Sequence, residues 1–172
     1  PAQPAALASA LEGVKVLDLC IVLAGPTTGR TLGEFGADVI KIDDPRRTAI
    51  VYHTEINRAK RSILIDLKHP AGLDLFWRLV DEADVIVQNY RDGGVGRLGI
   101  SYEEVRRRRP DIIYASLNAY GHLGPWARRP GHEQLAQAST GMQQRYGGDG
   151  TPAVQPYPSS EEHTSELQSR LH

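Results

Sequence analysis

Short apolar runs rich in valine, isoleucine and leucine recur along most of the chain, separated by segments with helical periodicity. Continuous runs of this length are typical of strands that are covered on both faces, whereas half-exposed strands alternate apolar and polar positions. The pattern predicts five buried strands, at residues 14–19, 37–42, 62–67, 84–88 and 111–116.

The segments between these strands predict helices. In residues 70–83, Leu73, Phe76, Trp77 and Val80 recur at spacings of three and four, which places one apolar stripe against a core. Proline at a first helical position, a glycine stop and a capping-box spacing mark other helix ends. The expected helices are residues 26–35, 70–83, 101–109 and 132–142. Strand–helix alternation predicts an α/β fold, with a Rossmann-like parallel sheet and flanking helices.

Composition supports one globular domain. The 172 residues are 40% hydrophobic and 24% charged, and the formal net charge of −1 gives no general attraction to nucleic acid or anionic membranes. The run Arg106–Arg109 could suggest nucleic-acid binding, but cations in the last turn of a helix complement its dipole, and Pro110 then ends it. The single Cys20 excludes a disulfide framework and is expected to be buried. No apolar run is long enough to predict a transmembrane helix, and because a single cysteine fits a reducing compartment we expect a cytoplasmic location.

Two breaks in composition suggest a domain organisation. Residues 1–10 are small and alanine-rich, and we expect a flexible lead-in. Residues 159–172 read like an adapter sequence translated in frame, and we expect a non-native tail. Residues 11–158 would then be the incomplete N-terminal part of a larger domain. The alternative is a natural, polar C-terminus.

Polar groups gather where the predicted strands end. The turn at Val22–Gly29 leads into a helix and could bind a phosphate through its backbone N–H groups, although a plain helix cap explains it equally well. Basic residues that follow strands would share one edge of a parallel sheet, and could hold a phosphorylated cofactor or simply face solvent: Arg46, Arg47, Lys68, Arg91 and Arg97.

One histidine is a candidate for proton transfer. His132 and Glu133 follow a glycine- and proline-rich loop, and loops on a rigid sheet often carry function. A histidine at a helix start is also commonly a cap or a surface residue. No spacing of cysteine and histidine suggests a metal site, and no nucleophile elbow is present.

Several segments in this order resemble the class III CoA-transferases, which include formyl-CoA and carnitine CoA-transferases, and their relative α-methylacyl-CoA racemase. The similarity covers residues 11–158. The segments that carry it are Leu11–Asp18, Ala24–Pro26, Gly33–Ile42, Asn57–Ile63, Asp66–Lys68, Asp84–Tyr90, Gly96–Gly99, Pro130–Glu133 and Ala136–Ala138.

The resemblance implies that coenzyme A lies across the strand ends. The positions that match CoA contacts of the family are Val22, Leu23, Ile65, Lys68, Asn89, Tyr90 and Arg97. The family often has arginine where this chain has Asp44, so Arg47 or Arg46 is expected to substitute for it.

The resemblance also implies a reaction and partners. CoA would move between an acyl-CoA and a carboxylic acid through a covalent aspartyl intermediate, and the aspartate is expected about 25–30 residues beyond Glu133, inside the suspected tail. The nucleophile would then be missing from the chain as written. A racemase that uses His132 with the missing aspartate is the alternative, and a non-catalytic CoA-binding fragment is a third possibility. The family further implies an interlocked homodimer, while the charge, hydropathy and ligand spacing described above give no reason to expect a metal, nucleic-acid or membrane partner.

Overall fold

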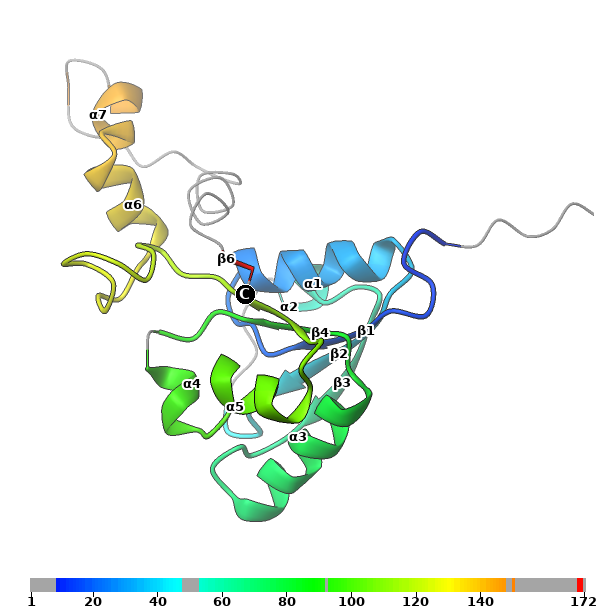
Figure 1. Cartoon of the computed structure of the whole chain (residues 1–172). Coiled ribbons are helices and arrows are strands. Elements are labelled where there is room, and N and C mark those ends of the chain that lie inside the picture. Colours follow the sequence, from blue (N-terminus) through cyan, green and yellow to red (C-terminus); the bar gives the residue numbers. More distant parts are fainter. Residues whose placement is uncertain (1–8, 48–52, 92, 148–149, 151–169, 172) are drawn as a thin grey trace, which may run out of the picture.

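The computed structural model describes residues 9–47, 53–91, 93–147, 150 and 170–171 (Figure 1). Five parallel strands form the sheet, in the spatial order β3-β2-β1-β4-β5. They are β1 (Lys15–Asp18), β2 (Asp38–Asp43), β3 (Lys60–Leu64), β4 (Val85–Gln88) and β5 (Ile113–Ser116). This architecture confirms the predicted α/β fold with a parallel sheet.

A sixth strand differs in direction. β6 (Arg170–Leu171) pairs antiparallel with the edge strand β5. It belongs to the segment that the sequence suggested is a non-native tail, and the other residues of that segment lie outside the described part of the chain. So do residues 1–8 of the expected lead-in.

Helices cover both faces of the sheet. Figure 1 shows α1 on one face and α3 and α5 on the other, while α6 and α7 project away from the sheet. The helices are α1 (Ala24–Glu34), α2 (His53–Ile56), α3 (Pro70–Glu82), α4 (Gly94–Arg97), α5 (Tyr102–Arg108), α6 (Glu133–Ser139) and α7 (Met142–Gly147). At α5, the capping box expected from Ser101 and Glu104 forms in both directions.

Most element ends lie within one or two residues of the prediction, and two elements differ more. Pairing of β3 with β2 ends at Leu64, so Ile65–Leu67 are not strand, although Ile65 and Leu67 are buried in the core. The single helix predicted over residues 132–142 is broken into α6 and α7, because Gly141 between them has φ +76°, a left-handed conformation that ends helices.

The core has two parts, one on each face of the sheet. Phe76 and Val80 of α3 are fully buried in the larger part, as the helical stripe predicted. Cys20 is fully buried in the smaller part, which confirms its expected location. Burial raises the pKa of the Cys20 thiol, and the nearby Asp18 carboxylate adds to this effect.

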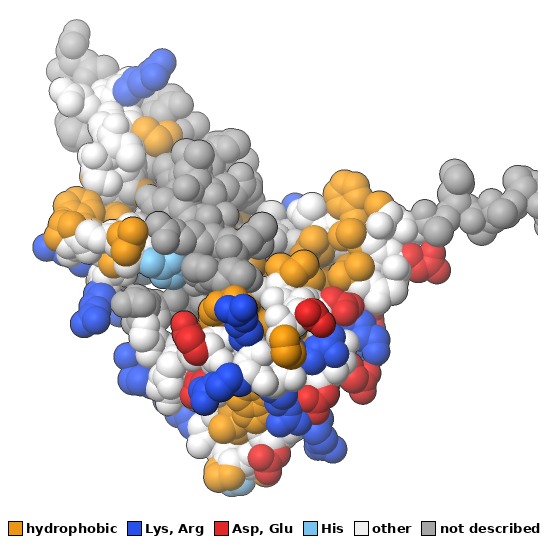
Figure 2. Space-filling view, viewed as in Figure 1, with side chains coloured by type: hydrophobic (Ala, Val, Ile, Leu, Met, Phe, Trp, Pro, Cys, Tyr) orange, Lys and Arg blue, Asp and Glu red, His pale blue; other side chains and the backbone are white. Residues whose placement is uncertain are grey.

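The arginine run holds two helices together. Arg108 makes a two-bond ion pair with Asp81 of α3 and lies over the Trp77 ring, 5.5 Å from its centroid. Arg109 donates to the carbonyl oxygens of Asp81 and Ala83, at 3.1 and 2.9 Å, and so caps the C-terminal end of α3. On the face shown in Figure 2, cationic and anionic side chains are interspersed. These contacts favour the structural interpretation of the run.

Candidate functional site

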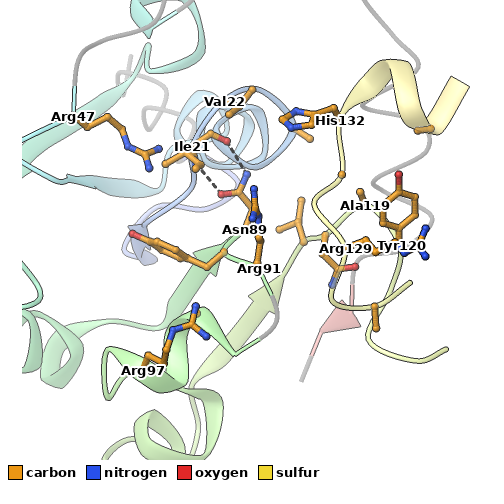
Figure 3. Close-up of a pocket in the computed structure, with 18 residues that line it drawn as sticks. Ile21, Val22, Arg47, Asn89, Arg91, Arg97, Ala119, Tyr120, Arg129 and His132 are labelled. Carbon is orange, nitrogen blue, oxygen red and sulfur yellow. Dashed lines mark hydrogen bonds between the residues drawn. The ribbon is translucent and has the colours of Figure 1, made fainter. Parts of the chain in front are cut away.

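A pocket of about 430 Å³ opens at the carboxyl ends of β1, β4 and β5 (Figure 3). Small-molecule sites in open α/β sheets form at this edge, because the loops that follow parallel strands converge there. The residues that line it are Ile21, Val22, Ala24, Arg47, Asn89, Tyr90, Arg91, Gly94, Arg97, Leu117, Asn118, Ala119, Tyr120, Ala127, Arg129, Gly131, His132 and Ala136.

The turn between β1 and α1 forms one wall. Val22 has φ +74°, which is uncommon for any residue with a side chain and especially for a β-branched one. Ile21, the residue before Val22, is bonded twice by the side chain of Asn89, which directly follows β4. Asn89 Nδ2 donates to the Ile21 carbonyl at 2.7 Å, and the Ile21 N–H donates to Asn89 Oδ1 at 2.8 Å. Figure 3 shows both bonds. The turn is therefore tied to the neighbouring strand.

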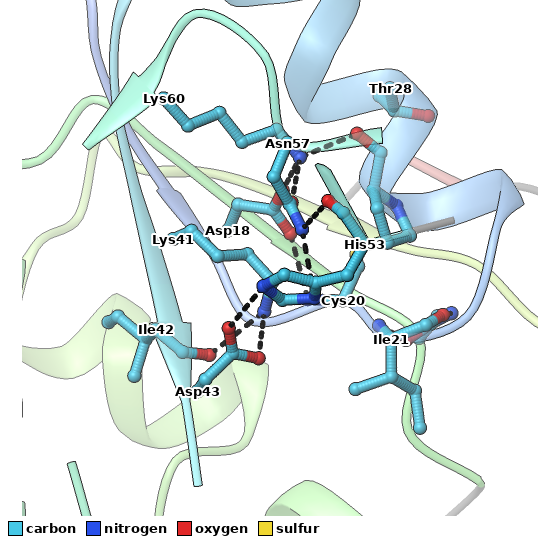
Figure 4. A network of polar contacts seen from close by, with 12 residues as sticks. Asp18, Cys20, Ile21, Thr28, Lys41, Ile42, Asp43, His53, Asn57 and Lys60 are labelled. Atoms are coloured by element: carbon cyan, nitrogen blue, oxygen red, sulfur yellow. Dashed lines mark hydrogen bonds and ion pairs between the residues drawn. The ribbon is translucent and has the colours of Figure 1, made fainter. Parts of the chain in front are cut away.

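A buried ion pair between Lys60 and Asp18 joins the end of β1 to the start of α1, on either side of the same turn (Figure 4). Lys60 Nζ donates to Asp18 Oδ2 at 2.7 Å, to the Pro26 carbonyl at 2.7 Å and to Asn57 Oδ1 at 2.9 Å. The side chains of Lys60 and Asp18 are 1% and 0% exposed. Burial lowers the pKa of Lys60, and the Asp18 carboxylate opposes that shift. Asp18 Oδ1 also accepts from the Cys20 N–H at 2.8 Å, which fixes the end of β1.

The pocket is lined by cations. Within the described residues, Arg47, Arg91, Arg97 and Arg129 line it without forming an ion pair to any carboxylate. Arg129 lies over the Trp126 ring, 5.2 Å from the centroid. Guanidinium groups without acidic partners favour an anionic ligand, and they suit phosphate groups in particular.

One aromatic side chain lies among these arginines. Tyr90 is partly buried between the core and the pocket. Burial raises the pKa of its hydroxyl, and the Arg47 guanidinium partly opposes this. The phenol is therefore neutral at physiological pH and adds no negative charge to an otherwise cationic wall.

His132 also lines the pocket, at the start of α6 (Figure 3). It is the N-cap residue of α6, but its side chain makes no capping hydrogen bond. Its backbone carbonyl accepts from the N–H groups of Leu135 and Ala136 at 3.0 and 3.1 Å. The imidazole is exposed at the pocket instead of being used by the helix. Glu133 is the first residue of α6, and its side chain is outside the described part of the structure.

The pocket brings together most of the residues that the sequence suggested. Val22, Arg47, Asn89, Tyr90, Arg97 and His132 all line it. Three others do not. Leu23 is the N-cap residue of α1, Ile65 is 3% exposed in the core, and Lys68 is exposed on the loop before α3. Their contacts with a ligand stay predictions.

The sequence did not identify three pocket-lining residues that follow β5. Asn118, Tyr120 and Arg129 line the pocket there. The glycine- and proline-rich loop of residues 120–131 was the available signal, but it does not say which of its side chains turn inward. A Cβ at Gly131 would collide with the Ala119 Cβ, so the two ends of this loop are in close contact.

A smaller cavity of about 200 Å³ adjoins the pocket and shares Ile21, Val22 and Arg47 with it. In the wall of this cavity Lys41, whose side chain is only 3% exposed, donates to Asp43 at 2.7 Å.

Among the residues that the structure describes, no cluster of three or more potential metal ligands occurs. Nor does this part of the chain contain a helix with the length and apolar character needed to span a bilayer.

Comparison with known proteins places these features in context. Residues 11–164 match the model of CoA-transferase family III. Human succinyl-CoA:glutarate CoA-transferase is 38% identical over 159 residues, which are 85% of this chain and 36% of the human protein. Formyl-CoA:oxalate CoA-transferase of Afipia carboxidovorans is 36% identical over 162 residues, 86% of this chain and 38% of that protein. The chain thus spans little more than a third of the length of these relatives.

Solved structures show the same fold. A crystal structure of Rv3272 from Mycobacterium tuberculosis superposes with a TM-score of 0.84 at 34% identity, and covers 94% of this chain and 47% of that one. A CAIB/BAIF family protein from Brucella suis gives a TM-score of 0.78 at 33% identity, with 92% and 47% covered.

Proposed function

This chain belongs to CoA-transferase family III, and from that membership we propose that its protein moves CoA between an acyl-CoA thioester and a carboxylic acid. One observation in the structure supports CoA as the ligand. The pocket at the strand ends is lined by Arg47, Arg91, Arg97 and Arg129, none of them neutralised by a described carboxylate. CoA carries a pyrophosphate and a 3′-phosphate, which are the partners that such guanidinium groups prefer.

We assign the ligand's parts by the character of the walls. The phosphate groups lie among the arginines. The adenine and the pantetheine arm pass along Tyr90 and the Val22 turn, which combine an aromatic ring with exposed apolar surface. The thioester end points toward His132, which lines the pocket at the start of α6.

The chemistry that we propose is covalent. An aspartate carboxylate attacks the thioester carbonyl, the C–S bond breaks, and CoA leaves as the thiolate while an acyl–aspartyl anhydride forms. The thiolate then attacks the aspartyl carbonyl, which releases the original acid and leaves an aspartyl–CoA thioester. The same steps then run in reverse with the acceptor acid. Its carboxylate attacks the aspartyl–CoA thioester to give a new anhydride and the CoA thiolate, and the thiolate attacks the acceptor's acyl carbonyl to give the new acyl-CoA and free aspartate. We expect the aspartate beyond residue 158, and a homodimer as the working assembly.

Calorimetric titration of the 172-residue chain with CoA tests the binding step. Arg97→Met should lower the affinity about tenfold, because losing one charge-assisted contact is worth about 1.4 kcal/mol or more. Arg61→Met is the matched control, since Arg61 is on β3, its side chain is 67% exposed, and it pairs with Asp38 outside the pocket. Equal affinities for the two variants, or no binding by the wild-type chain, would contradict the assignment.

The transfer step needs a separate assay on the protein that carries this chain. With an acyl-CoA and a carboxylic acid, we expect a new thioester and the released acid in equal amounts. With a 2-methylacyl-CoA in deuterated water and no acceptor, we expect no deuterium at the α-carbon. Uptake of deuterium without transfer would instead indicate proton abstraction, the reaction of a racemase.

A further inference from the structure

The side chain of Asn89 is used by the backbone rather than left open to a ligand. Its two functional groups both bond to Ile21, at 2.7 and 2.8 Å, across a sequence separation of 68 residues. The first turn of α1 also packs against it, because a Cβ at Gly25 would lie 3.1 Å from Asn89 Nδ2. The Ile21 N–H belongs to the peptide before this residue and its C=O to the peptide that joins it to Val22, so the two bonds restrain the peptide units on both sides of Ile21.

The residue after this fixed peptide is held in an unfavourable conformation. Val22 has φ +74° and the residue is 51% exposed, so burial of the valine does not offset the strain. Conformations of this kind persist only where surrounding contacts enforce them. Val22 also lines both the large pocket and the smaller cavity, so the turn forms the partition between them.

The rest of the turn is fixed independently of Asn89. The Cys20 N–H bonds to Asp18, and Lys60 links Asp18 to the Pro26 carbonyl. The buried pair therefore holds the two ends of the turn, while Asn89 holds its middle. Loss of Asn89 would free the peptide at Ile21 and let Val22 relax to a negative φ, with the strand and helix still in place.

We propose that Asn89 is a positioning residue: its carboxamide keeps Val22 in the left-handed conformation that shapes the pocket wall, and it supports CoA binding through the turn. This role differs from the direct CoA contact that the family resemblance implies. The inference rests on the proposed function for its ligand, but the clamp itself can be measured without one.

A substitution series separates the two roles. Asn89→Ala should lower the affinity for CoA about tenfold in the wild-type background. In a Val22→Gly background the same substitution should cost less than about threefold, because glycine adopts φ +74° without strain and needs no clamp. Val22→Ala is the matched control: it removes the valine side chain beyond Cβ but keeps the strain, so Asn89→Ala should again cost about tenfold.

Hydrogen exchange provides the readout that is independent of CoA. Exchange of the Ile21 amide should accelerate at least about tenfold in Asn89→Ala, because that amide loses its acceptor. The Leu19 amide, which donates to the Val87 carbonyl at 2.9 Å, should keep its protection and so report an intact sheet.

Three results would overturn the proposal. The first is an equal loss of affinity in all three backgrounds, which indicates a direct contact. The second is no loss of affinity on removal of Asn89. The third is unchanged exchange at Ile21. If the wild-type chain does not bind CoA, the proposed function fails, and exchange at Ile21 alone then decides whether the clamp exists.

Discussion

Replacing Lys60 by methionine should destabilise the fold more than almost any other single change at a lysine or arginine. The substitution keeps an unbranched stem of similar length but removes the ammonium group. Asp18, 0% exposed, is then left as a buried carboxylate without its partner, and the Pro26 and Asn57 oxygens lose a donor. Breaking one side of a buried ion pair typically costs about 3–5 kcal/mol.

Urea denaturation of the 172-residue chain measures this cost. With a slope of about 2 kcal/mol per molar urea, which is usual for a domain of this size, the midpoint should fall by about 1.5–2.5 M. Arg61→Met is again the matched control, because Arg61 is the next residue on β3 and its ion pair with Asp38 is exposed. Exposed pairs contribute about 0–1 kcal/mol, so its midpoint should change little.

A double variant tests the cause. Asp18→Asn together with Lys60→Met removes both charges and leaves an oxygen at residue 18 to accept from the Cys20 N–H. The double variant should be more stable than Lys60→Met alone, because no uncompensated charge remains buried. A Lys60→Met midpoint no lower than that of Arg61→Met would refute the reasoning, and so would a double variant less stable than the single one.

Three further changes test other parts of the molecule. The hydrogen bonds from Arg108 hold the pKa of Asp81 below its usual 3.8, so the ionised carboxylate stabilises the fold above pH 3.8 and this stabilisation is lost as the pH falls through the lowered pKa. Asp81→Asn should therefore reduce the urea midpoint at neutral pH. In strong acid the midpoints of the variant and the wild type should be the same. Gly131→Ala should cost about 1–3 kcal/mol by collision with Ala119, and adding Ala119→Gly should restore the midpoint; an unrestored double variant would contradict the contact. Cys20, buried and with a raised pKa, should react with a disulfide reagent only in denaturing urea, and rapid reaction of the native chain would show that the core opens.

The strands were predictable because burial on both faces leaves a direct mark on the sequence. Each apolar run matched a strand of the sheet, and the stripe on residues 70–83 matched α3. The boundaries were less accurate. Ile65 and Leu67 continue the apolar run and are packed in the core, but the backbone there no longer pairs with β2. Apolar character reports burial, and burial does not require a strand.

The site was predictable only in outline. Parallel strands end at the same edge, so residues that follow them, such as Arg97 and Tyr90, could be expected together. Which side chains of the loop before α6 face inward depends on the path of that loop. Arg129 lines the pocket and its neighbour Arg128 does not, and since both are arginines their chemistry could not tell them apart.

The amino-acid sequence alone was enough to predict the fold class, the edge of the sheet at which the pocket opens and the family, because these depend on local periodicity and on ordered motifs. The roles of Asn89 and Lys60 emerged only from contacts across 68 and 42 residues. A carboxamide or an ammonium group can face a ligand, solvent or the backbone, and its chemistry is the same in each case. Buried polar groups must be hydrogen-bonded, and the tertiary structure decides which partner lies within reach of each one.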